Sequence, residues 1–402
     1  MRNDDFQVLG VERKKRQRYR WLVVMLAVIA IAIAIGLGVY WATSPKTVRT
    51  GKKMGDPTVV PELQAVADSL LNAKLTEIDG LQGQVIVMEV QTGEILALVG
   101  RERKFDGTFQ PCENFAFQQE LGSVAKTASL LAVLETGKMK LSDEVETAGG
   151  VWPVGEDMLM RDHNWRRGGY GIISLERVLE LSSNIGMGQA VDKVFHDHQQ
   201  QFFDMLDKMS FGQPDSIEGI NGLKPSVYSS PKDGEWSSWK IWWSAIGYER
   251  KMAPIQMLTF YNAIANDGKM VKPTLKTGKV EIINPQIASK ANIDSMQVAL
   301  EYVVSRGLGK LAATPFVGVA GKTGTSQVGV YDFGHDTSVE EYQLSFCGYF
   351  PANQPKYSII VSLNKLGLPA SGGGMAGPVF RQVVEWIIEH RSLETKPILL
   401  PD

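Results

Sequence analysis

A serine followed three residues later by a lysine stands at the start of an apolar stretch. In ELGSVAKTASLLAVLETG these residues are Ser123 and Lys126, and the run of Ala, Leu and Val after the lysine predicts a buried helix that Gly137 can cap. Positions three apart share a helix face, so the amine can reach the hydroxyl. A lysine can activate a serine when desolvation or nearby cations lower its pKa. The pair is a candidate nucleophile and base, although S-x-x-K also occurs by chance.

A second polar pair follows the stretch LERVLEL, which has a helical pattern up to about Leu181. Ser182 and Asn184 come next, two residues apart in a predicted turn. Ser and Asn are common helix caps, and taken alone the pair fits capping better. The functional interpretation is that the hydroxyl relays a proton and the amide holds a lysine and a substrate carbonyl.

A third set lies in GKTGTSQ, residues 321–327, at the end of an apolar β-run. Lys322 adds a cation, and Gly324 lets a substrate backbone approach the strand closely. Thr323 and Thr325 offer hydroxyls to an anionic carboxylate. Capture of a peptide by strand pairing would fit this pattern, and so would a glycine kink in an ordinary strand.

Together the three sets resemble the motifs of penicillin-recognising serine acyltransferases, because S-x-x-K, S-x-N and K-T-G occur in that order. Other stretches look similar to the same family: GQVIVMEVQTGEILALVG, MAPIQMLTFYNAIANDGKMVKPTL, SFCGYFPANQPKYSIIV and GPVF. Over about residues 61–390 the chain resembles the penicillin-binding proteins, which belong to the serine D,D-peptidase and β-lactamase-like superfamily. The transpeptidase module of class B members is the most similar.

The resemblance implies a role for each motif residue. It implies that Ser123 is the nucleophile and Lys126 the general base. It implies that a supporting polar network is formed by Ser182, Asn184 and Lys322. It also implies a substrate-binding strand made of Thr323, Gly324 and Thr325, whose threonines would bind the carboxylate of a D-Ala-D-Ala stem peptide or of a β-lactam. The backbone N–H groups of Ser123 and Thr325 would form the oxyanion hole.

Secondary-structure patterns place these motifs in a mixed fold. A helix is predicted from Pro61, then a hairpin around QTGE, a helix-and-loop region over roughly 105–300, two strands around PANQPK, and an amphipathic helix in GPVFRQVVEWIIEHR. Strands at both ends of the chain predict one sheet assembled from distant segments. With the resemblance, we expect a mixed α/β (α+β) fold with a central antiparallel sheet flanked by helices and a mostly helical subdomain.

An uncharged stretch precedes this domain. Residues 21–41, WLVVMLAVIAIAIAIGLGVYW, would span roughly 31 Å as a helix, about the thickness of a bilayer's hydrocarbon core. Basic residues crowd RKKRQRYR before the stretch and are fewer after it, which places the N-terminus in the cytoplasm. A cleaved signal peptide is the alternative, but the run is long and YWATSPK is a poor cleavage site.

These patterns give a domain organisation. We expect a cytoplasmic tail at 1–20, a single-pass transmembrane helix at 21–41, a linker at 42–60, a transpeptidase domain at 61–392 and a C-terminal tail at 393–402. The chain would then be anchored in the cytoplasmic membrane, with its catalytic domain on the extracytoplasmic, periplasmic side.

Composition argues against other classes of function. With 42 basic and 44 acidic residues, the chain gives no reason to expect nucleic acid. No metal or cofactor is expected, because HDH at 196–198 and His335 beside Asp336 lack a third ligand at a recognised spacing. Spacing does not show whether Cys112 and Cys347 pair, and two isolated apolar thiols are favoured.

Three features depart from the family pattern or stand outside it. Leu121 occupies the position where members usually have proline, which alters the approach to the helix more than the chemistry. Residues 42–60 cannot supply the pedestal domain of class B proteins, which puts in doubt what such a domain does, for example contact with a membrane glycan polymerase. GEWSSWKIWWSAIGYE holds four tryptophans, for which packing in a core or groove wall is favoured over an exposed platform.

The expected function is a peptidoglycan D,D-transpeptidase that cross-links stem peptides through a serine acyl-enzyme and is inhibited by β-lactams. A D,D-carboxypeptidase or β-lactamase shares the motifs and differs in how fast water attacks the acyl-enzyme. A non-catalytic, membrane-anchored β-lactam or muropeptide sensor, or a scaffold for a polymerase, is a third possibility. Slow deacylation is expected, because no E-x-x-L-N stretch follows the second motif and a polar Asn184 stands where class D β-lactamases have an apolar residue.

Overall fold

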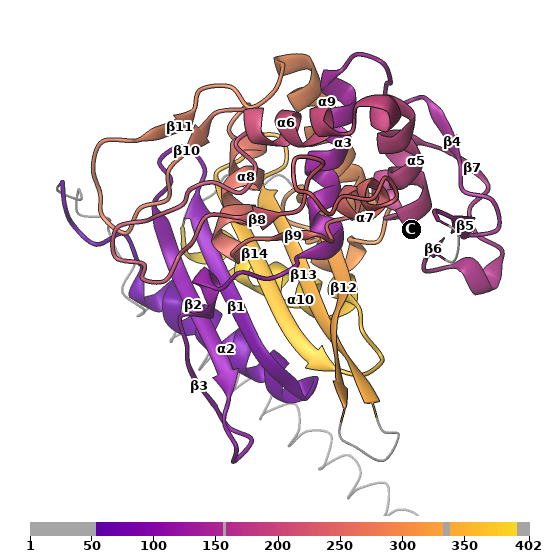
Figure 1. Ribbon diagram of the computed structural model, residues 1–402. Coiled ribbons are helices and arrows are strands. Elements are labelled where there is room, and N and C mark those ends of the chain that lie inside the picture. The colour runs from indigo at the N-terminus through magenta and orange to yellow at the C-terminus, as the bar shows by residue number, and fades with distance from the viewer. Residues whose placement is uncertain (1–53, 156–157, 333–337, 392–402) are drawn as a thin grey trace, which may run out of the picture. The chain divides into compact units, whose positions relative to one another are not determined.

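The computed structural model describes residues 54–155, 158–332 and 338–391 (Figure 1). Within these ranges no helix has both the length and the apolar composition needed to cross a bilayer. The predicted membrane span at 21–41, the tails at 1–20 and 393–402 and residues 42–53 of the predicted linker lie outside the described residues.

A six-stranded antiparallel sheet forms the centre of the described domain (Figure 1). The strand order is β12-β13-β14-β1-β2-β3, so strands from the two ends of the chain pair where β14 meets β1. This confirms the prediction of one antiparallel sheet built from distant segments. The strands are β1 (Gly80–Glu89), β2 (Ile95–Arg103), β3 (Phe109–Pro111), β12 (Ala320–Asp332), β13 (Ser338–Phe350) and β14 (Tyr357–Leu366).

Helices cover both faces of this sheet. The α-helices are α2 (Pro61–Glu77), α3 (Lys126–Glu135), α4 (Leu175–Glu180), α5 (Asn184–Phe195), α6 (Gln200–Lys208), α7 (Lys240–Ala245), α8 (Pro254–Ala265), α9 (Lys290–Ser305) and α10 (Gly372–His390). Short 3-10 turns are η1 (Asn114–Ala116), η2 (Gly122–Ala125), η3 (Trp165–Arg167), η4 (His196–His198) and η5 (Lys310–Ala312).

Alternating side chains of β1 separate two hydrophobic cores. Val85 and Val87 pack with α2 and α10 on one face, whereas Ile86 and Met88 pack with the helical part on the other. A strand that is buried on both faces must be apolar at nearly every position, which explains the continuous run VIVM. The larger core contains α3, α5, α8 and α9 and thus supports the motif-bearing helices.

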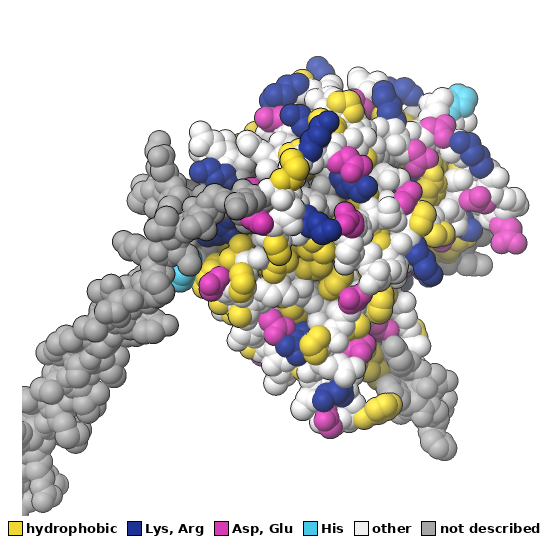
Figure 2. Space-filling view, turned by 90° about the vertical axis from the view of Figure 1, so that its left-hand side faces the viewer, with side chains coloured by type: hydrophobic (Ala, Val, Ile, Leu, Met, Phe, Trp, Pro, Cys, Tyr) yellow, Lys and Arg dark blue, Asp and Glu magenta, His cyan; other side chains and the backbone are white. Residues whose placement is uncertain are grey.

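Four small two-stranded sheets are formed by segments that lie between the helices of the helical part. They are β4 (Glu144–Glu146) with β7 (Ile172–Ser174), β5 (Val151–Pro153) with β6 (Leu159–Arg161), β8 (Val227–Tyr228) with β9 (Arg250–Lys251), and β10 (Met270–Val271) with β11 (Ile282–Asn284). The side of the molecule that carries β10 and β11 shows basic and acidic side chains interspersed (Figure 2), in keeping with the balanced charge.

Three sequence features find their places in this fold. The last residues of the predicted linker are hydrogen-bonded to the domain, since Gly55 N donates to Thr277 O and Thr58 N donates to Leu275 O. Both cysteines are free thiols, one of them buried in β13 and the other, Cys112, half-buried. The four tryptophans are buried or half-buried, and the Trp242 ring lies over Gly188.

Helix α3, which follows the first motif, is attached to α8 by a buried hydroxyl. The Tyr261 Oη atom donates to Val124 O at 2.8 Å and shares a 2.7 Å hydrogen bond with Thr127 Oγ1. The Tyr261 side chain is completely buried, which raises the pKa of its hydroxyl well above the usual value. The phenol is therefore a neutral donor that fixes the start of α3.

Replacing this phenol should weaken the domain. Tyr261→Phe leaves Thr127 Oγ1 and Val124 O short of a partner in the core, and we expect the free energy of unfolding to fall by about 1–3 kcal/mol. Urea denaturation of the full chain in detergent measures this. Tyr302→Phe is the matched control, because the Tyr302 hydroxyl has no hydrogen-bond partner among the described residues. Equal stabilities of the two variants would contradict this role of Tyr261.

Candidate functional site

Ser123 lies in the 3-10 turn η2, directly before α3. The backbone N–H of Lys126 donates to Ser123 O, which sets the two residues one turn apart as the motif predicts. Gly122 has a φ of 59°, and a Cβ there would meet Ser326 at 2.7 Å, so the turn fits only glycine. The Ser123 side chain is half-buried, and its hydroxyl has no hydrogen-bond partner among the described residues.

Lys126 is completely buried, and its ammonium nitrogen contacts the second motif. Nζ lies 2.7 Å from Asn184 Oδ1, 2.6 Å from Ser182 O and 3.3 Å from Ser182 Oγ. Three oxygen acceptors thus surround one amine in the protein interior. The structure brings Lys126, Ser182 and Asn184 into one group, but it shows no hydrogen bond from Lys126 to Ser123 Oγ.

Ser182 has the left-handed backbone conformation that usually requires glycine, with a φ of 53°. It ends α4 in a Schellman motif, since Ser182 N donates to Leu179 O and Ser183 N donates to Val178 O. A left-handed non-glycine residue costs roughly 1–2 kcal/mol. Such strain concentrates at functional sites, and here it points the Ser182 carbonyl at Lys126.

The N-cap of α5 is neither Ser182 nor Asn184, although that pair taken alone fits capping in the sequence. Ser183 is the N-cap of α5, because its hydroxyl accepts from Gly186 N at 2.9 Å. Ser182 and Asn184 therefore lie on either side of the capping residue. Their side chains are free to contact lysines instead.

Lys322 is the second buried lysine of the site. Its Nζ donates to Ser182 Oγ at 2.7 Å and to Thr323 O at 2.9 Å, and its side chain is completely buried. One serine hydroxyl therefore contacts two lysines. No carboxylate forms an ion pair with either lysine among the described residues.

Burial lowers the pKa of both amines. For Lys126, desolvation lowers the pKa to about 7, against an opposing attraction from Asp162. For Lys322, desolvation and then repulsion by Lys126 lower the pKa well below its usual value. Two amines so close to one another cannot both hold a proton without cost. A neutral amine is therefore present in the site near neutral pH.

Strand β12 carries the third motif at the free edge of the sheet. We expected GKTGTSQ at the end of a β-run, but the strand begins at Ala320 and continues to Asp332, so the motif lies in its first half. The polar residues that follow look like a loop in the sequence, yet they pair with β13. Gly324 is tightly packed by the protein itself, because a Cβ there would overlap Ser345 Oγ and would meet Leu121 O at 2.9 Å.

Backbone groups of β12 that point away from β13 face the open edge. Thr323 O accepts from Lys322, and Gln327 N donates to Tyr248 Oη at 3.2 Å, so both point outward. Groups two residues apart on a strand point the same way, and the register is unbroken here, so Thr325 N points outward as well. That N–H is therefore not used in the pairing with β13.

The threonine side chains lie on the other face of β12 from Lys322, because side chains alternate along a strand. Thr325 is exposed, and its Oγ1 accepts from Gly372 N, the first residue of α10, at 2.9 Å. Its hydroxyl proton remains free to donate. Thr323 is buried and lies beside Gly373.

Asp162 holds the second motif in place, and sequence reasoning missed it. Its Oδ1 accepts from Asn184 N at 2.5 Å and from Ile185 N at 3.1 Å, and its Oδ2 accepts from Ser183 Oγ at 2.7 Å. The carboxylate thus caps the positive end of α5. In the sequence it sits in RDHNWRR, which has the composition of a solvated loop, so no local signal identified it.

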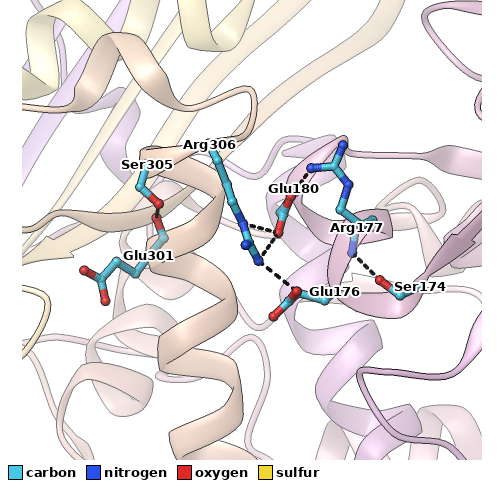
Figure 3. A network of polar contacts seen from close by, with 7 residues as sticks. All are labelled: Ser174, Glu176, Arg177, Glu180, Glu301, Ser305 and Arg306. Atoms are coloured by element: carbon cyan, nitrogen blue, oxygen red, sulfur yellow. Dashed lines mark hydrogen bonds and ion pairs between the residues drawn. The ribbon is translucent and has the colours of Figure 1, made fainter. Parts of the chain in front are cut away.

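A buried carboxylate on α4 provides a second support that the sequence did not reveal. Glu180 is completely buried between two guanidinium groups, with Oε2 at 2.6 Å from Arg177 and Oε1 at 2.8 Å from Arg306 (Figure 3). Arg306 also pairs with Glu176 at 2.8 Å. Because Glu180 is two residues before Ser182, this network joins the strained turn to the end of α9.

Among the described residues no group of three or more His, Cys, Asp or Glu side chains could hold a metal ion. His196 bonds only to Asp192, at 3.0 Å. His335 and Asp336 lie outside the described residues.

Residues 83–385 match the family model of the penicillin binding protein transpeptidase domain. Among curated relatives, the penicillin-binding protein PbpB of Mycolicibacterium smegmatis is 26% identical over 349 residues, which cover 78% of this chain and 51% of that protein. A probable peptidoglycan D,D-transpeptidase, PbpC of Pseudomonas aeruginosa, is 25% identical over 373 residues, covering 89% and 62%.

A solved structure has a similar fold. Penicillin-binding protein 3 of Mycobacterium tuberculosis, in complex with aztreonam, aligns with a TM-score of 0.71 at 23% identity, covering 85% of this chain and 80% of that chain. The chain spans about half the length of the first curated relatives that it matches.

The buried amine should make stability depend on pH. The folded-state pKa of Lys126 is about 7, below its ordinary value of 10.5, so the unfolded chain binds more protons between these values. Stability should therefore rise with pH across this window, by at most about 1.4 kcal/mol per pH unit for this group. In urea denaturation, the stability of the wild type relative to Lys126→Gln should increase from about pH 7 to about pH 9. A pH-independent difference would show that the amine is not desolvated as described.

Proposed function

Because this chain belongs to the family of penicillin-binding protein transpeptidase domains, we propose that it is a peptidoglycan D,D-transpeptidase that β-lactams inhibit. It would cleave a stem peptide ending in D-Ala-D-Ala and join the acyl group to an amine of a second peptide. Related proteins whose names state this activity, such as PbpC of Pseudomonas aeruginosa, support the proposal.

The observation that carries the proposal is the buried amine beside an accessible serine. Lys126 is one helical turn from Ser123 and has a pKa lowered to about 7 by desolvation. An amine that is neutral near physiological pH can accept the proton of a serine hydroxyl. A lysine retained only for structure would gain nothing from this burial, because a buried charge without a carboxylate partner is destabilising.

Acylation would proceed in balanced steps. Ser123 Oγ attacks the carbonyl carbon of the penultimate D-alanine and passes its proton to Lys126 Nζ. The new C–O bond forms, the C–N bond breaks, and the terminal D-alanine leaves with the proton returned through Lys126 and Ser182. Lys322 donates to Ser182 Oγ and so keeps this hydroxyl oriented. Because Lys322 and a protonated Lys126 repel each other, Lys322 also favours transfer of the proton from Lys126 to the leaving amine.

Backbone and side-chain donors would bind the charges of the substrate. The N–H groups of Ser123 and Thr325 would receive the oxyanion, and such a donor typically contributes about a hundred- to a thousandfold to the rate. The Thr325 hydroxyl, whose oxygen already accepts from Gly372, would donate to the substrate carboxylate. Thr323 would assist it, and Gly324 would permit close approach of the substrate backbone.

Deacylation by water would be slow. Asp162 is the carboxylate that acts on Lys126, yet its oxygens are already engaged by Ser183 Oγ and by the N–H groups of Asn184 and Ile185. It therefore has little capacity to activate a water molecule at the ester. This favours transfer to an amine over the β-lactamase alternative.

The proposal extends to the setting of the reaction. Residues 21–41 would anchor the chain in the cytoplasmic membrane and place the catalytic domain outside it, which the charge asymmetry around that stretch supports. A membrane glycan polymerase would be a fitting partner, since a cross-linking enzyme needs freshly made strands.

Benzylpenicillin should form a long-lived adduct on Ser123. The β-lactam acylates the same hydroxyl that attacks D-Ala-D-Ala, and the ester persists because the oxygens of Asp162 are already engaged and have little capacity to activate water. Mass spectrometry of the full chain in detergent, with peptide mapping, measures the adduct and its lifetime. We expect one penicilloyl group that survives repeated washing.

Two variants make this test specific. Ser123→Ala should carry no adduct, whereas Ser129→Ala, which changes a buried serine of the neighbouring helix α3 with no role in the proposed reaction, should be labelled. Labelling of Ser123→Ala would refute the assignment of the nucleophile. Rapid multiple-turnover hydrolysis of benzylpenicillin would instead identify a β-lactamase.

A further inference from the structure

A loop rich in arginine lies beside the second motif. This arginine loop, residues 161–170, begins at the end of β6 and contains the turn η3. Asp162 anchors it to the start of α5, and Asn164 Nδ2 donates to Gly169 O at 2.8 Å across the loop. A Cβ on Gly150 would meet Trp165 Cα at 2.8 Å, which shows how closely the backbone is packed. The loop is therefore held in one conformation at both its ends.

Two guanidinium groups flank an exposed indole on this loop. Arg161 lies 5.3 Å and Arg166 lies 4.9 Å from the ring centre of Trp165, which is 38% exposed. Arginine over an aromatic face is partly ordered by the cation–π attraction while its N–H groups remain free. Such a pre-ordered fork loses little freedom when it binds a carboxylate.

The cluster has charge that the described protein does not neutralise. The side chains of Arg161, Arg166 and Arg167 are exposed, and none of them forms an ion pair or hydrogen bond with residues 54–155, 158–332 or 338–391. Other arginines of the domain are paired, for example Arg101 with Asp68 and Arg306 with Glu176. An unpaired group of three arginines is a candidate site for an anion.

The arginine loop is connected directly to the catalytic residues. Asn184 Nδ2 donates to Arg161 O at 2.8 Å, and Asn184 Oδ1 accepts from Lys126 at 2.7 Å, so two hydrogen bonds separate the loop from the proposed base. Burial lowers the pKa of His163 on the loop, the charge of Asp162 opposes this shift, and the charges of Lys126, Arg167 and Lys322 add to it.

We propose that Arg161, Trp165 and Arg166 bind a carboxylate of the acceptor peptide, the peptide whose amine receives the acyl group from Ser123. This inference rests on the function proposed above. If both peptides end in D-alanine, the acceptor carries a C-terminal carboxylate of its own. In the proposed arrangement the donor peptide occupies the side of the site formed by Thr323 and Thr325. The arginine loop lies beside the start of α5, where it can bind the second carboxylate.

The transfer step that this site would serve is balanced. The acceptor nitrogen attacks the ester carbonyl carbon on Ser123, a C–N bond forms and the bond from carbon to Oγ breaks. One proton of the amine passes to Lys126 and then to Ser123 Oγ, which restores the free enzyme. Binding the acceptor through its carboxylate raises the local concentration of the amine and so favours aminolysis over hydrolysis.

The test uses two peptides that differ by one charge, Gly-Gly-D-Ala with a free C-terminus and the same peptide with a C-terminal amide. The full chain in detergent is first saturated with benzylpenicillin, which acylates Ser123 and fills the donor side of the site. Each peptide is then titrated, and its affinity is measured by ligand-observed NMR. We expect the acid to bind about tenfold more tightly than the amide, as a charge-assisted contact with arginine allows.

Two double variants separate this site from general electrostatic attraction. Arg161→Gln/Arg166→Gln should reduce the acid-to-amide preference to about one. Lys269→Gln/Lys279→Gln removes the same charge from exposed lysines that form no ion pair within the described ranges. They belong to the β10 and β11 side, far from the arginine loop in Figure 1, and this variant should keep the preference. The proposal is wrong if the wild type shows no preference, if the arginine variant retains it, or if both variants lose it equally.

The outcome can be told apart from a failure of the proposed function. If benzylpenicillin leaves no adduct on wild-type Ser123, the acyl-enzyme assignment fails. The two peptides are then titrated into the unlabelled protein and its variants, where the dependence on Arg161 and Arg166 still decides whether the arginine loop binds a carboxylate.

Discussion

Burial of two lysine side chains around one serine hydroxyl is the constraint on which the rest of the site depends. Removing an ammonium group from water costs several kcal/mol, and neither Lys126 nor Lys322 has a carboxylate ion-pair partner among the described residues. The fold meets this cost with neutral acceptors, with a strained left-handed Ser182 and with deprotonation of an amine. The strained Ser182 and the deprotonated amine each cost stability, and in the proposed mechanism that neutral amine is the base.

The constraint explains why the site is assembled from distant parts of the chain. Lys126 begins a helix in the larger core, Ser182 ends a short helix, and Lys322 lies on an edge strand. Hydrogen bonds and ion pairs of residues outside the motifs hold these elements in place. Asp162 fixes the start of α5, and Glu180 joins the end of α4 to Arg306. A shift of any one element would expose the lysines to water and return their pKa values toward the ordinary range.

Local patterns predicted much of the fold, and distant contacts account for what they missed. The hairpin of β1 and β2, helix α2 and the pairing of strands from both chain ends followed from strong periodicity. The second half of β12 was missed because a polar edge strand resembles a loop. Asp162 and Glu180 were missed because their partners are far away in sequence, Arg306 lying 126 residues from Glu180. No local pattern marks a charged residue that becomes buried only after folding.

The pH dependence of acylation tests the central claim, that Lys126 is a neutral base, most directly. The second-order rate constant for acylation by benzylpenicillin, measured by stopped flow on the full chain in detergent, should rise with pH through a midpoint near 7, the value to which burial lowers the pKa of Lys126. Asp162→Asn should move the midpoint downward, because it removes the charge that opposes this shift. A midpoint near the ordinary lysine value of 10.5, or a rate that does not change with pH, would contradict the account.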